Sequence, residues 1–334
     1  MKGTVLITGA TGSLGLQAVR QLLASHSSLT VVGTVRNATK SPKSPHLLRL
    51  EELSRQYPSS QLLMKSLDLD SLSDVESFAR DIASQVESGQ LPPISAIICN
   101  AFMWSLNGQK FSKDGFESGF QVNHLAHFSL VLRLLRSMNQ SGRVVMIGSE
   151  VYDPDHVNPI SKLGANINSS ENLDYLVKPG PDQPGTEHDM GWQRYANSKL
   201  ANVMFMMSLN QRLQQEPQFK NITVTAMDPG GLVDSRAHTA QRAINQFLFK
   251  VFAFLLPVIS IFTNRLRSNA DSARDVVALA LDPDFESKRG YFDGRKPITL
   301  AHAADVAKRE SLWTRCWEWT KLKEDETCVP KELK

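Results

Sequence analysis

The chain has 334 residues, of which 41% are hydrophobic and 21% charged, so we expect a packed globular core and no extended disorder. Its 37 basic and 34 acidic residues give a net charge of +3, which offers no argument for a nucleic-acid partner. Three cysteines (Cys99, Cys316 and Cys328) lack metal-ligand spacing, so we predict no metal site and a reducing, cytoplasmic location. The stretch "GTVLITGA" runs straight into glycines and predicts no signal peptide.

Apolar runs alternate with helical patterns along most of the chain. In order, the pattern predicts a strand at 3–9, a helix at 13–25, strands at 29–36 and 62–69, a helix at 71–86, a strand at 94–100, a helix at 115–138, and strands at 142–149 and 222–230. The strand runs are apolar on both faces, as in a parallel sheet that helices cover on both sides. This alternation predicts an α/β fold with a doubly wound parallel sheet, in a single domain.

Two segments do not fit the alternation. Residues 150–187 are rich in Pro, Asn, Asp and Gly and predict a long inserted loop. Residues 231–267 contain the apolar run 247–262, which is shorter than the ~20 residues of a bilayer-spanning helix and is interrupted by Lys250 and Pro257. Because loops this long in compact domains are often functional, both segments are candidate covers of a ligand site.

Three glycines, Gly9, Gly12 and Gly15, stand where the first strand ends and the first helix begins. Glycine there permits positive φ and lets the backbone approach a ligand closely. The N-terminus of the helix presents N–H groups and a partial positive charge, which suit a diphosphate. Dinucleotides bind at the first strand–helix turn of a doubly wound sheet, so we predict a pyrophosphate site; the alternative is a turn without a ligand.

The second strand ends in "GTVRN", where a dinucleotide site needs a group for the adenosine ribose. A carboxylate there would accept a hydrogen bond from a free 2′-hydroxyl and favour NAD. The stretch holds no carboxylate, and the Arg36 guanidinium suits a 2′-phosphate. We therefore predict NADP(H) over NAD(H), against the alternative that Arg36 is an ordinary surface cation.

The stretch "YANSK" places Tyr195 and Lys199 four residues apart, on one face of a helix that begins near Asp189. A phenol, with a pKa of about 10, is a poor base at neutral pH. A nearby ammonium favours the phenolate and lowers that pKa. We therefore predict that Tyr195 exchanges a proton with a carbonyl or alcohol oxygen while a hydride moves.

Several motifs in a fixed order extend this interpretation: "TGATGSLG" (8–15), "LDL" (67–69), "CNA" (99–101), "QVNHLAHF" (121–128), "VVMIGS" (144–149), "YANSK" (195–199) and "DPGG" (228–231). Together they resemble the short-chain dehydrogenase/reductase family over residues 3–300. The resemblance implies a Rossmann-type fold for residues 1–300, followed by a helical tail at 301–334. In that tail, Trp313 and Trp317 share one helical face and are expected to pack against the domain.

The resemblance also implies roles for individual residues. Tyr195 matches the catalytic acid/base, Lys199 the residue that lowers the pKa of the tyrosine and binds the nicotinamide ribose, and Ser149 the hydroxyl that orients the substrate carbonyl. Asn123 matches the residue that holds a water in the proton relay; alternatively it caps backbone groups of its helix. His124 and His127, which follow it, are interpreted as packing or surface residues.

The resemblance implies further contacts to the cofactor. Asp68 matches the carboxylate beside the adenine amino group; alternatively it marks the start of the next helix. The other cofactor-binding residues that match are Gly9, Thr11, Gly12, Ser13, Leu14, Gly15, Arg36, Leu69, Asn100, Ala101, Asn123, Tyr195, Lys199, Pro229, Gly230 and Leu232.

The sequence departs from the common family pattern at three places. Ser13 stands where the common form has its middle glycine, and Phe102 replaces the glycine of the usual "NNAG", which would reshape the floor near the cofactor. Asp234 stands where a threonine is expected after "DPGG", so that contact is not assigned. The wide spacing of Ser149 and Tyr195 and the pattern "YANSKLANVMF" are similar to the retinol dehydrogenase-like and protochlorophyllide reductase-like branch, and to fungal enzymes of polyketide and terpenoid biosynthesis.

The apolar run 247–262 lies where the family places its substrate-binding helices. Three interpretations stay open: a buried lid over the pocket, a lid that also contacts a membrane surface, and a homodimer contact. We expect an NADP(H)-dependent oxidoreductase that interconverts a ketone and a secondary alcohol on a bulky hydrophobic, polyketide-, terpenoid- or steroid-like molecule, in secondary metabolism. The alternatives are reduction of a carbon–carbon double bond and a non-catalytic NADP(H)-binding regulator, which would usually lack the tyrosine or the lysine.

Overall fold

The computed structural model describes residues 3–39, 42–153, 163–167, 172–240, 247–248, 250–256, 265–300 and 305–333. Within them, eight strands form one sheet in the order β10-β9-β6-β5-β4-β1-β2-β3. The strands are β1 (Thr4–Ile7), β2 (Thr30–Val35), β3 (Gln61–Ser66), β4 (Ile94–Cys99), β5 (Met138–Ile147), β6 (Thr223–Asp228), β9 (Gly290–Asp293) and β10 (Lys296–Ile298). Within this sheet, β10 alone runs antiparallel to its neighbour, so the doubly wound parallel sheet is confirmed.

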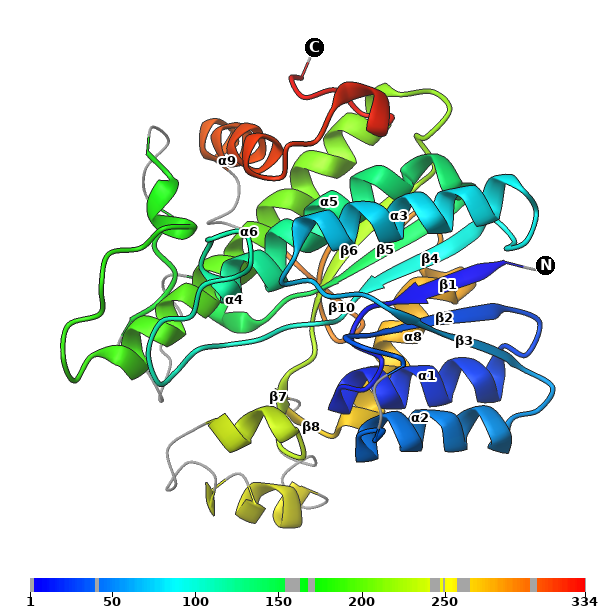
Figure 1. Cartoon of the computed structure of the whole chain (residues 1–334), viewed down its shortest axis with the longest axis horizontal. Helices are drawn as coiled ribbons and strands as arrows, with labels where there is room; N and C mark the ends of the chain where they lie inside the picture. Colours follow the sequence, from blue (N-terminus) through cyan, green and yellow to red (C-terminus); the bar gives the residue numbers. More distant parts are fainter. Residues whose placement is uncertain are drawn as a thin grey trace.

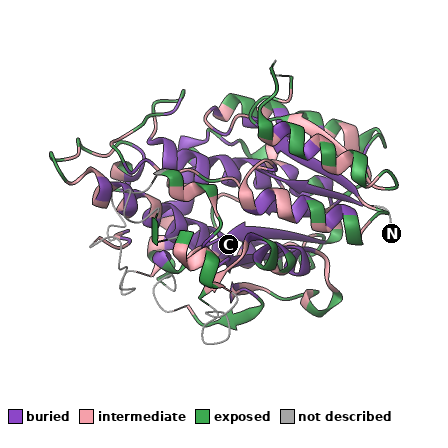
Figure 2. Cartoon of the chain, turned by 90° about the horizontal axis from the view of Figure 1, so that it is seen from below, coloured by how far each residue is buried: buried purple, intermediate pink, exposed green. Residues whose placement is uncertain are grey.

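Helices cover both faces of the sheet (Figure 1). One face carries α1, α2 and α8, and the other carries α3, α5 and α6 with α9 outside them. The helices are α1 (Ser13–Ser25), α2 (Pro45–Gln56), α3 (Leu72–Glu87), α4 (Ser118–Phe120), α5 (Ala126–Leu134), α6 (Glu187–Gln215), α8 (Asn269–Leu281) and α9 (Val306–Trp319). The middle strands are buried between two apolar clusters, one on each face, while the outer faces of the helices are exposed (Figure 2).

The predicted single helix at 115–138 is interrupted. A turn of π-helix at Gln121–Leu125 separates α4 from α5, and a 3-10 turn at Leu135–Ser137 follows. A π-turn inserts an extra residue into the helix and is often found at functional sites. Here it contains Asn123, so the backbone deviates at a residue that the sequence analysis singled out.

The C-terminal tail belongs to the core, as predicted from its tryptophans. The ring of Trp313 stacks on Phe205 of α6 with centroids 5.9 Å apart, and the Arg212 guanidinium lies 3.9 Å from the centroid of the same ring. Trp317 is also buried in this cluster. The apolar face of α9 therefore completes the layer over α6.

The segment after β6 begins with a small parallel pair, β7 (Gly231–Leu232) and β8 (Leu266–Arg267). Between them, residues 247–248 and 250–256 are helical. The rest of the apolar run, Phe249 and 257–262, lies outside the described residues. Among the helices that are described, none has both the length and the apolar character needed to cross a membrane.

Candidate active site

A cavity of about 820 Å³ opens at the carboxyl ends of the central strands. Ligands of doubly wound sheets lie beyond these strand ends, where the order of the strands reverses. Every residue that the sequence analysis assigned to the site lines this cavity, except Gly15 and Asn123. The motifs from seven separate stretches are therefore brought together in space.

The glycine turn after β1 follows the predicted geometry. Gly9 has φ +66°, and a Cβ there would come within 2.9 Å of the Ala101 Cα. Gly12 is the N-cap of α1, and no side chain caps this helix end, which lines the cavity. Its first-turn N–H groups thus suit an anionic ligand.

Gly15 has a packing role instead. A Cβ on Gly15 would lie 2.3 Å from the Gly9 carbonyl oxygen and 2.8 Å from the Asn100 Nδ2. The absence of a side chain lets α1 approach the turn closely, which is how this residue supports the site without lining it.

Thr8 joins the first turn to the neighbouring strand. Its Oγ1 accepts hydrogen bonds from the backbone N–H groups of Asn100 and Ala101, both at 3.0 Å, and lies 2.9 Å from the His127 Nε2. Burial lowers the pKa of His127 to about 4, so the ring is neutral. Its Nδ1 donates to the Asn123 carbonyl at 3.2 Å, which leaves Nε2 to accept from Thr8. His127 is therefore a hydrogen-bonded core residue, consistent with the packing interpretation.

The end of the cavity beside the glycine turn is charged. Arg36 is exposed at the end of β2 and lines the cavity together with Asp68. The Asp68 carboxylate forms an ion pair with Lys113 at 2.7 Å and accepts a hydrogen bond from the Asp70 N–H. Its pKa is lowered: burial acts in the opposite direction, but the interactions with Lys113, Asp70 and Arg36 outweigh it.

Arg236 is a cation at this end that the sequence analysis missed. Its guanidinium donates to the Thr11 carbonyl and to the Ser13 Oγ, and its backbone N–H donates to the same hydroxyl at 3.1 Å. Arg49 lies close enough to lower the pKa of Arg236, although burial contributes more. Arg236 is 223 positions from Ser13 in the chain and belongs to no recognised motif, so no sequence signal pointed to it.

Ser149, Tyr195 and Lys199 meet at the other end of the cavity. Ser149 follows β5, while Tyr195 and Lys199 share a face of α6. The Ser149 hydroxyl lies close enough to the Tyr195 phenol to act on its pKa. The Lys199 Nζ lies 5.4 Å from the centroid of the Tyr195 ring and donates to the Ile147 carbonyl at 2.7 Å.

Burial shifts the pKa of Tyr195 upward, against the direction expected from Lys199, whose own effect on the phenol stays a prediction. The Ser149 hydroxyl opposes this rise in the pKa, and the Asp228 carboxylate adds to it. Burial also lowers the pKa of Lys199 to about 7, while Asp228 acts to raise it. Helix spacing predicted correctly that the two groups are neighbours. Lys199 is buried and Tyr195 is partly buried, and burial disfavours the charged form of each side chain.

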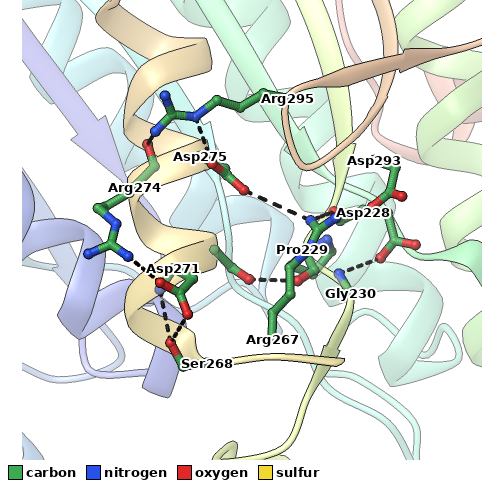
Figure 3. Close-up of polar contacts among 11 residues, drawn as sticks. Asp228, Pro229, Gly230, Arg267, Ser268, Asp271, Arg274, Asp275, Asp293 and Arg295 are labelled. Carbon is green, nitrogen blue, oxygen red and sulfur yellow. Dashed lines mark hydrogen bonds and ion pairs between the residues drawn. The ribbon is translucent and has the colours of Figure 1, made fainter. Parts of the chain in front are cut away.

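Asp228 is a buried carboxylate beside this group that the sequence analysis treated only as part of a turn. It accepts a hydrogen bond from the Gly230 N–H at 2.8 Å, and burial raises its pKa to about 6 (Figure 3). Arg267 of β8 forms an ion pair with Asp293, and its guanidinium nitrogen lies 3.9 Å from a carboxylate oxygen of Asp275 (Figure 3).

The Pro229 carbonyl accepts a hydrogen bond from the Ser272 Oγ at 2.6 Å. This contact from α8 and the ion pairs of β8 hold the turn that contains Pro229 and Gly230 at the cavity wall, where both residues were predicted.

Asn123 is not among the described residues that line the cavity. Its Oδ1 accepts from the Met103 N–H at 2.7 Å, and its Nδ2 donates to the Met103 carbonyl at 2.9 Å and the Ser198 Oγ at 3.0 Å. The side chain thus fixes the loop after β4 against α6. Its role in a water relay stays a prediction.

The inserted loop is attached to α6 on both sides of Tyr195. Arg194 donates two hydrogen bonds to Asp182, at 2.6 and 3.1 Å. Asn197, the central residue of "YANSK", accepts from the Asn166 N–H at 2.7 Å and donates to its side chain at 3.0 Å. The helix that presents the tyrosine therefore also holds the described parts of the loop.

Apolar and aromatic side chains form the wall beyond Tyr195. Phe102, at the position of the expected glycine, lines the cavity together with Trp104 and Trp192. Leu248 and Phe252 also line the cavity; they are four residues apart in the helical segment that follows β7. Within the described residues of the predicted lid, the apolar run therefore contributes two side chains to the cavity wall.

Comparisons with known proteins agree with this geometry. A family model described as short chain dehydrogenase matches residues 3–154, and one described as AcuH dehydrogenase domain matches residues 235–329. The short-chain dehydrogenase iccH of Talaromyces variabilis is 30% identical over an alignment of 366 positions, gaps included. The alignment covers 98% of this chain and 98% of that protein. Retinol dehydrogenase 14 of Mus musculus is 28% identical over 323 residues, which cover 93% of this chain and 83% of that protein.

Solved structures share the fold. The angucycline C-6 ketoreductase LanV, solved with bound NADP, matches with a TM-score of 0.56 and 15% identity, over 88% of this chain and 96% of that one. At this level of identity the match shows the common architecture.

Proposed function

Because the chain belongs to the short-chain dehydrogenase/reductase family, whose oxidoreductases use nicotinamide cofactors, we propose that it interconverts a ketone and a secondary alcohol with NADP(H). The observation that carries the proposal is one cavity with an arginine and an uncapped helix at one end and Ser149, Tyr195 and Lys199 at the other. An extended NADP(H) has its adenosine with the 2′-phosphate at one end, its pyrophosphate in the middle and its nicotinamide at the other end, so a cavity with these two ends suits it.

The residues at the phosphate end fit the cofactor. The open end of α1 and the Gly9 turn suit the pyrophosphate, Arg36 lines the cavity, and Arg236 adds a cation that is hydrogen-bonded to Thr11 and Ser13 of the turn. The LanV structure with bound NADP supports this choice by analogy of fold. NADP(H) specificity is therefore part of the proposal.

The residues at the other end fit carbonyl chemistry. The bound nicotinamide supplies or accepts the hydride. The neighbouring hydroxyls of Ser149 and Tyr195 can both bind one substrate oxygen, and Tyr195 gives that oxygen a proton during reduction. The Tyr195 phenol is protonated at neutral pH, so it carries the proton that reduction requires. Lys199, on the next turn of α6, then stabilises the phenolate that remains.

The cavity is suited to a bulky apolar substrate. Its wall beyond Tyr195 consists of Phe102, Trp104, Trp192 and the two lid residues Leu248 and Phe252. Such a lining matches small-molecule pockets in which apolar side chains surround a few polar groups. The name of retinol dehydrogenase 14 indicates a hydrophobic substrate for that relative, which supports the same class here.

The test is NADPH oxidation with a hydrophobic ketone by the wild type and by Tyr195→Phe. We expect the substitution to lower kcat at least about 100-fold, because the proton donor is lost while the ring remains. NADPH affinity, measured by calorimetry, should change less than about threefold and serves as the control for folding. Full turnover by Tyr195→Phe would refute the mechanism.

A further inference from the structure

Four aromatic rings meet at the catalytic end of the cavity. Trp104 lies at their centre, with ring centroids 5.7 Å from Phe102, 5.1 Å from Trp192 and 5.3 Å from Tyr195. Trp192 and Tyr195 are themselves 5.7 Å apart at 82°. All four residues line the cavity, so the catalytic phenol is part of an aromatic wall.

The wall has room for one more ring. Trp104 meets Phe102 at 87° and Tyr195 at 69°, both edge-to-face. Trp104 is half-buried and Phe102 is 38% exposed, so neither ring is enclosed by protein atoms on all sides. A flat π-system that enters the cavity can therefore join the cluster, with its edge or face against these rings.

The described cavity lining carries carboxylates at both ends, and its lysine and arginine side chains are Lys199 at the catalytic end and Arg36 at the other. Apolar residues make up much of the rest of the described lining (Met103, Val122, Val151, Leu248, Phe252 and Leu266), while Asp228 and Glu150 are the carboxylates at the catalytic end. Arg36, Asp68 and Asp70 lie at the adenosine end, beyond the glycine turn. Within its described residues, the wall thus offers no cation for a substrate carboxylate or phosphate, apart from Lys199 beneath the phenol.

We propose that the substrate is an uncharged ketone fused or conjugated to a planar aromatic ring system, which packs on Trp104 and Phe102 while its oxygen meets Tyr195 and Ser149. This inference rests on the proposed function and narrows its substrate class. A saturated ring of the same size fills the cavity equally well but has no π-face. It therefore loses the directional attraction that an aromatic pair has beyond burial of area.

The experiment compares 1-tetralone with 1-decalone, which share a carbon skeleton and differ in one planar ring. We measure kcat/KM for both ketones with the wild type, Trp104→Leu, Trp104→Phe and the control Phe254→Leu. Phe254 is 83% exposed and is not among the described cavity residues. Comparing variants cancels the different intrinsic reactivities of the two ketones.

We expect Trp104→Leu to lower kcat/KM for tetralone about tenfold, mainly through KM, and that for decalone less than threefold. Trp104→Phe should retain most of the wild-type ratio of kcat/KM for tetralone to kcat/KM for decalone, and Phe254→Leu should leave this ratio unchanged. Equal losses for both ketones in Trp104→Leu would overturn the aromatic inference and leave the proposed oxidoreductase standing.

A binding measurement separates the two claims. Calorimetry on the NADPH-loaded protein gives the dissociation constant of 1-naphthol, a planar alcohol that cannot be reduced. We expect Trp104→Leu to weaken this binding about tenfold even if neither ketone is turned over. Unchanged 1-naphthol affinity would count against the aromatic wall whatever the activity, whereas lost turnover with retained, Trp104-dependent binding would count against the proposed reaction only.

Discussion

Lys199 shows how strongly burial governs the chemistry of single residues in this protein. Its ammonium is 2% exposed with one backbone carbonyl as a hydrogen-bond partner, and its pKa falls to about 7. In the unfolded chain the pKa returns to its usual 10.5. Between these values the unfolded chain binds more protons at this site than the folded protein does, so stability rises with pH across this window.

Lys199→Met should remove that dependence from the cofactor-free protein. The free energy of unfolding of the wild type, relative to Lys199→Met, should increase by about 2 kcal/mol between pH 6.5 and 8.5. Urea unfolding at the two pH values measures this difference. Parallel pH curves for the two proteins would mean that Lys199 is charged when folded.

A substitution of Arg36 tests whether the protein prefers NADP(H) over NAD(H). Arg36→Asp places a carboxylate where the 2′-phosphate of NADP(H) is expected, and the new carboxylate can accept from a free 2′-hydroxyl. The ratio of NADH to NADPH dissociation constants should fall at least about tenfold. Arg20→Asp, an equal change of charge on an exposed residue of α1 that does not line the cavity, should leave the ratio unchanged. An unaltered preference for NADPH in Arg36→Asp would refute the role of Arg36.

Some residue roles could not be predicted from the sequence. Arg236 donates a hydrogen bond to Ser13, which is 223 positions away in the sequence, so the pair is visible only in the folded structure. The upward effect of burial on the pKa of Tyr195 was missed because helical spacing reports which groups are neighbours and says nothing of their exposure to water. Ser149, Tyr195 and Lys199, by contrast, were singled out by the family resemblance and by helix spacing, and all three line the cavity; their catalytic roles stay predictions.

At the scale of elements, the position of α1 depends on close contact with the turn before it. Gly15→Ala would force a Cβ to 2.3 Å from the Gly9 carbonyl oxygen, so α1 must shift. We expect a loss of about 1–3 kcal/mol in stability and weaker NADPH binding, because the shifted helix end no longer faces the phosphates.

Gly180→Ala is the matched control for this prediction. A Cβ on Gly180 would have no described atom within 4 Å beyond its chain neighbours, and the residue has no positive φ, so the added methyl meets open space. Its unfolding free energy and NADPH affinity should equal those of the wild type. If Gly15→Ala behaved in the same way, α1 would not be fixed by this contact.

The elements were predicted unevenly for physical reasons. The strands β1 to β6 were found because each contains an apolar run. The inner strands are buried on both faces, whereas β3, at the sheet edge, is only partly buried. The short strands β9 and β10 were missed, since "GYFDG" and "KPI" are too brief for such a run, and β10 is exposed along its length. The π-turn at Asn123 was missed because its residues fit a regular helical pattern; tertiary hydrogen bonds to its side chain accompany the deviation.

At the scale of the whole molecule, the parts of the site come from both halves of the chain. The first half supplies the glycine turn, Arg36 and the aromatic Phe102 and Trp104, and the second half supplies Tyr195 and Lys199 on α6. The sheet order brings these segments together because β1, β4, β5 and β6 are neighbours. The fold class was therefore predictable from local patterns, whereas the shape of the substrate cavity depends on contacts between distant segments.

The most direct test of the account is to follow the hydride itself. Single-turnover reduction of a conjugated aromatic enone with NADPH deuterated at C4, analysed by NMR of the product, shows which carbon receives the label. We predict deuterium on the former carbonyl carbon, now a carbinol, with the double bond intact. Deuterium on a former alkene carbon, with the ketone retained, would contradict the account and assign the protein to double-bond reduction.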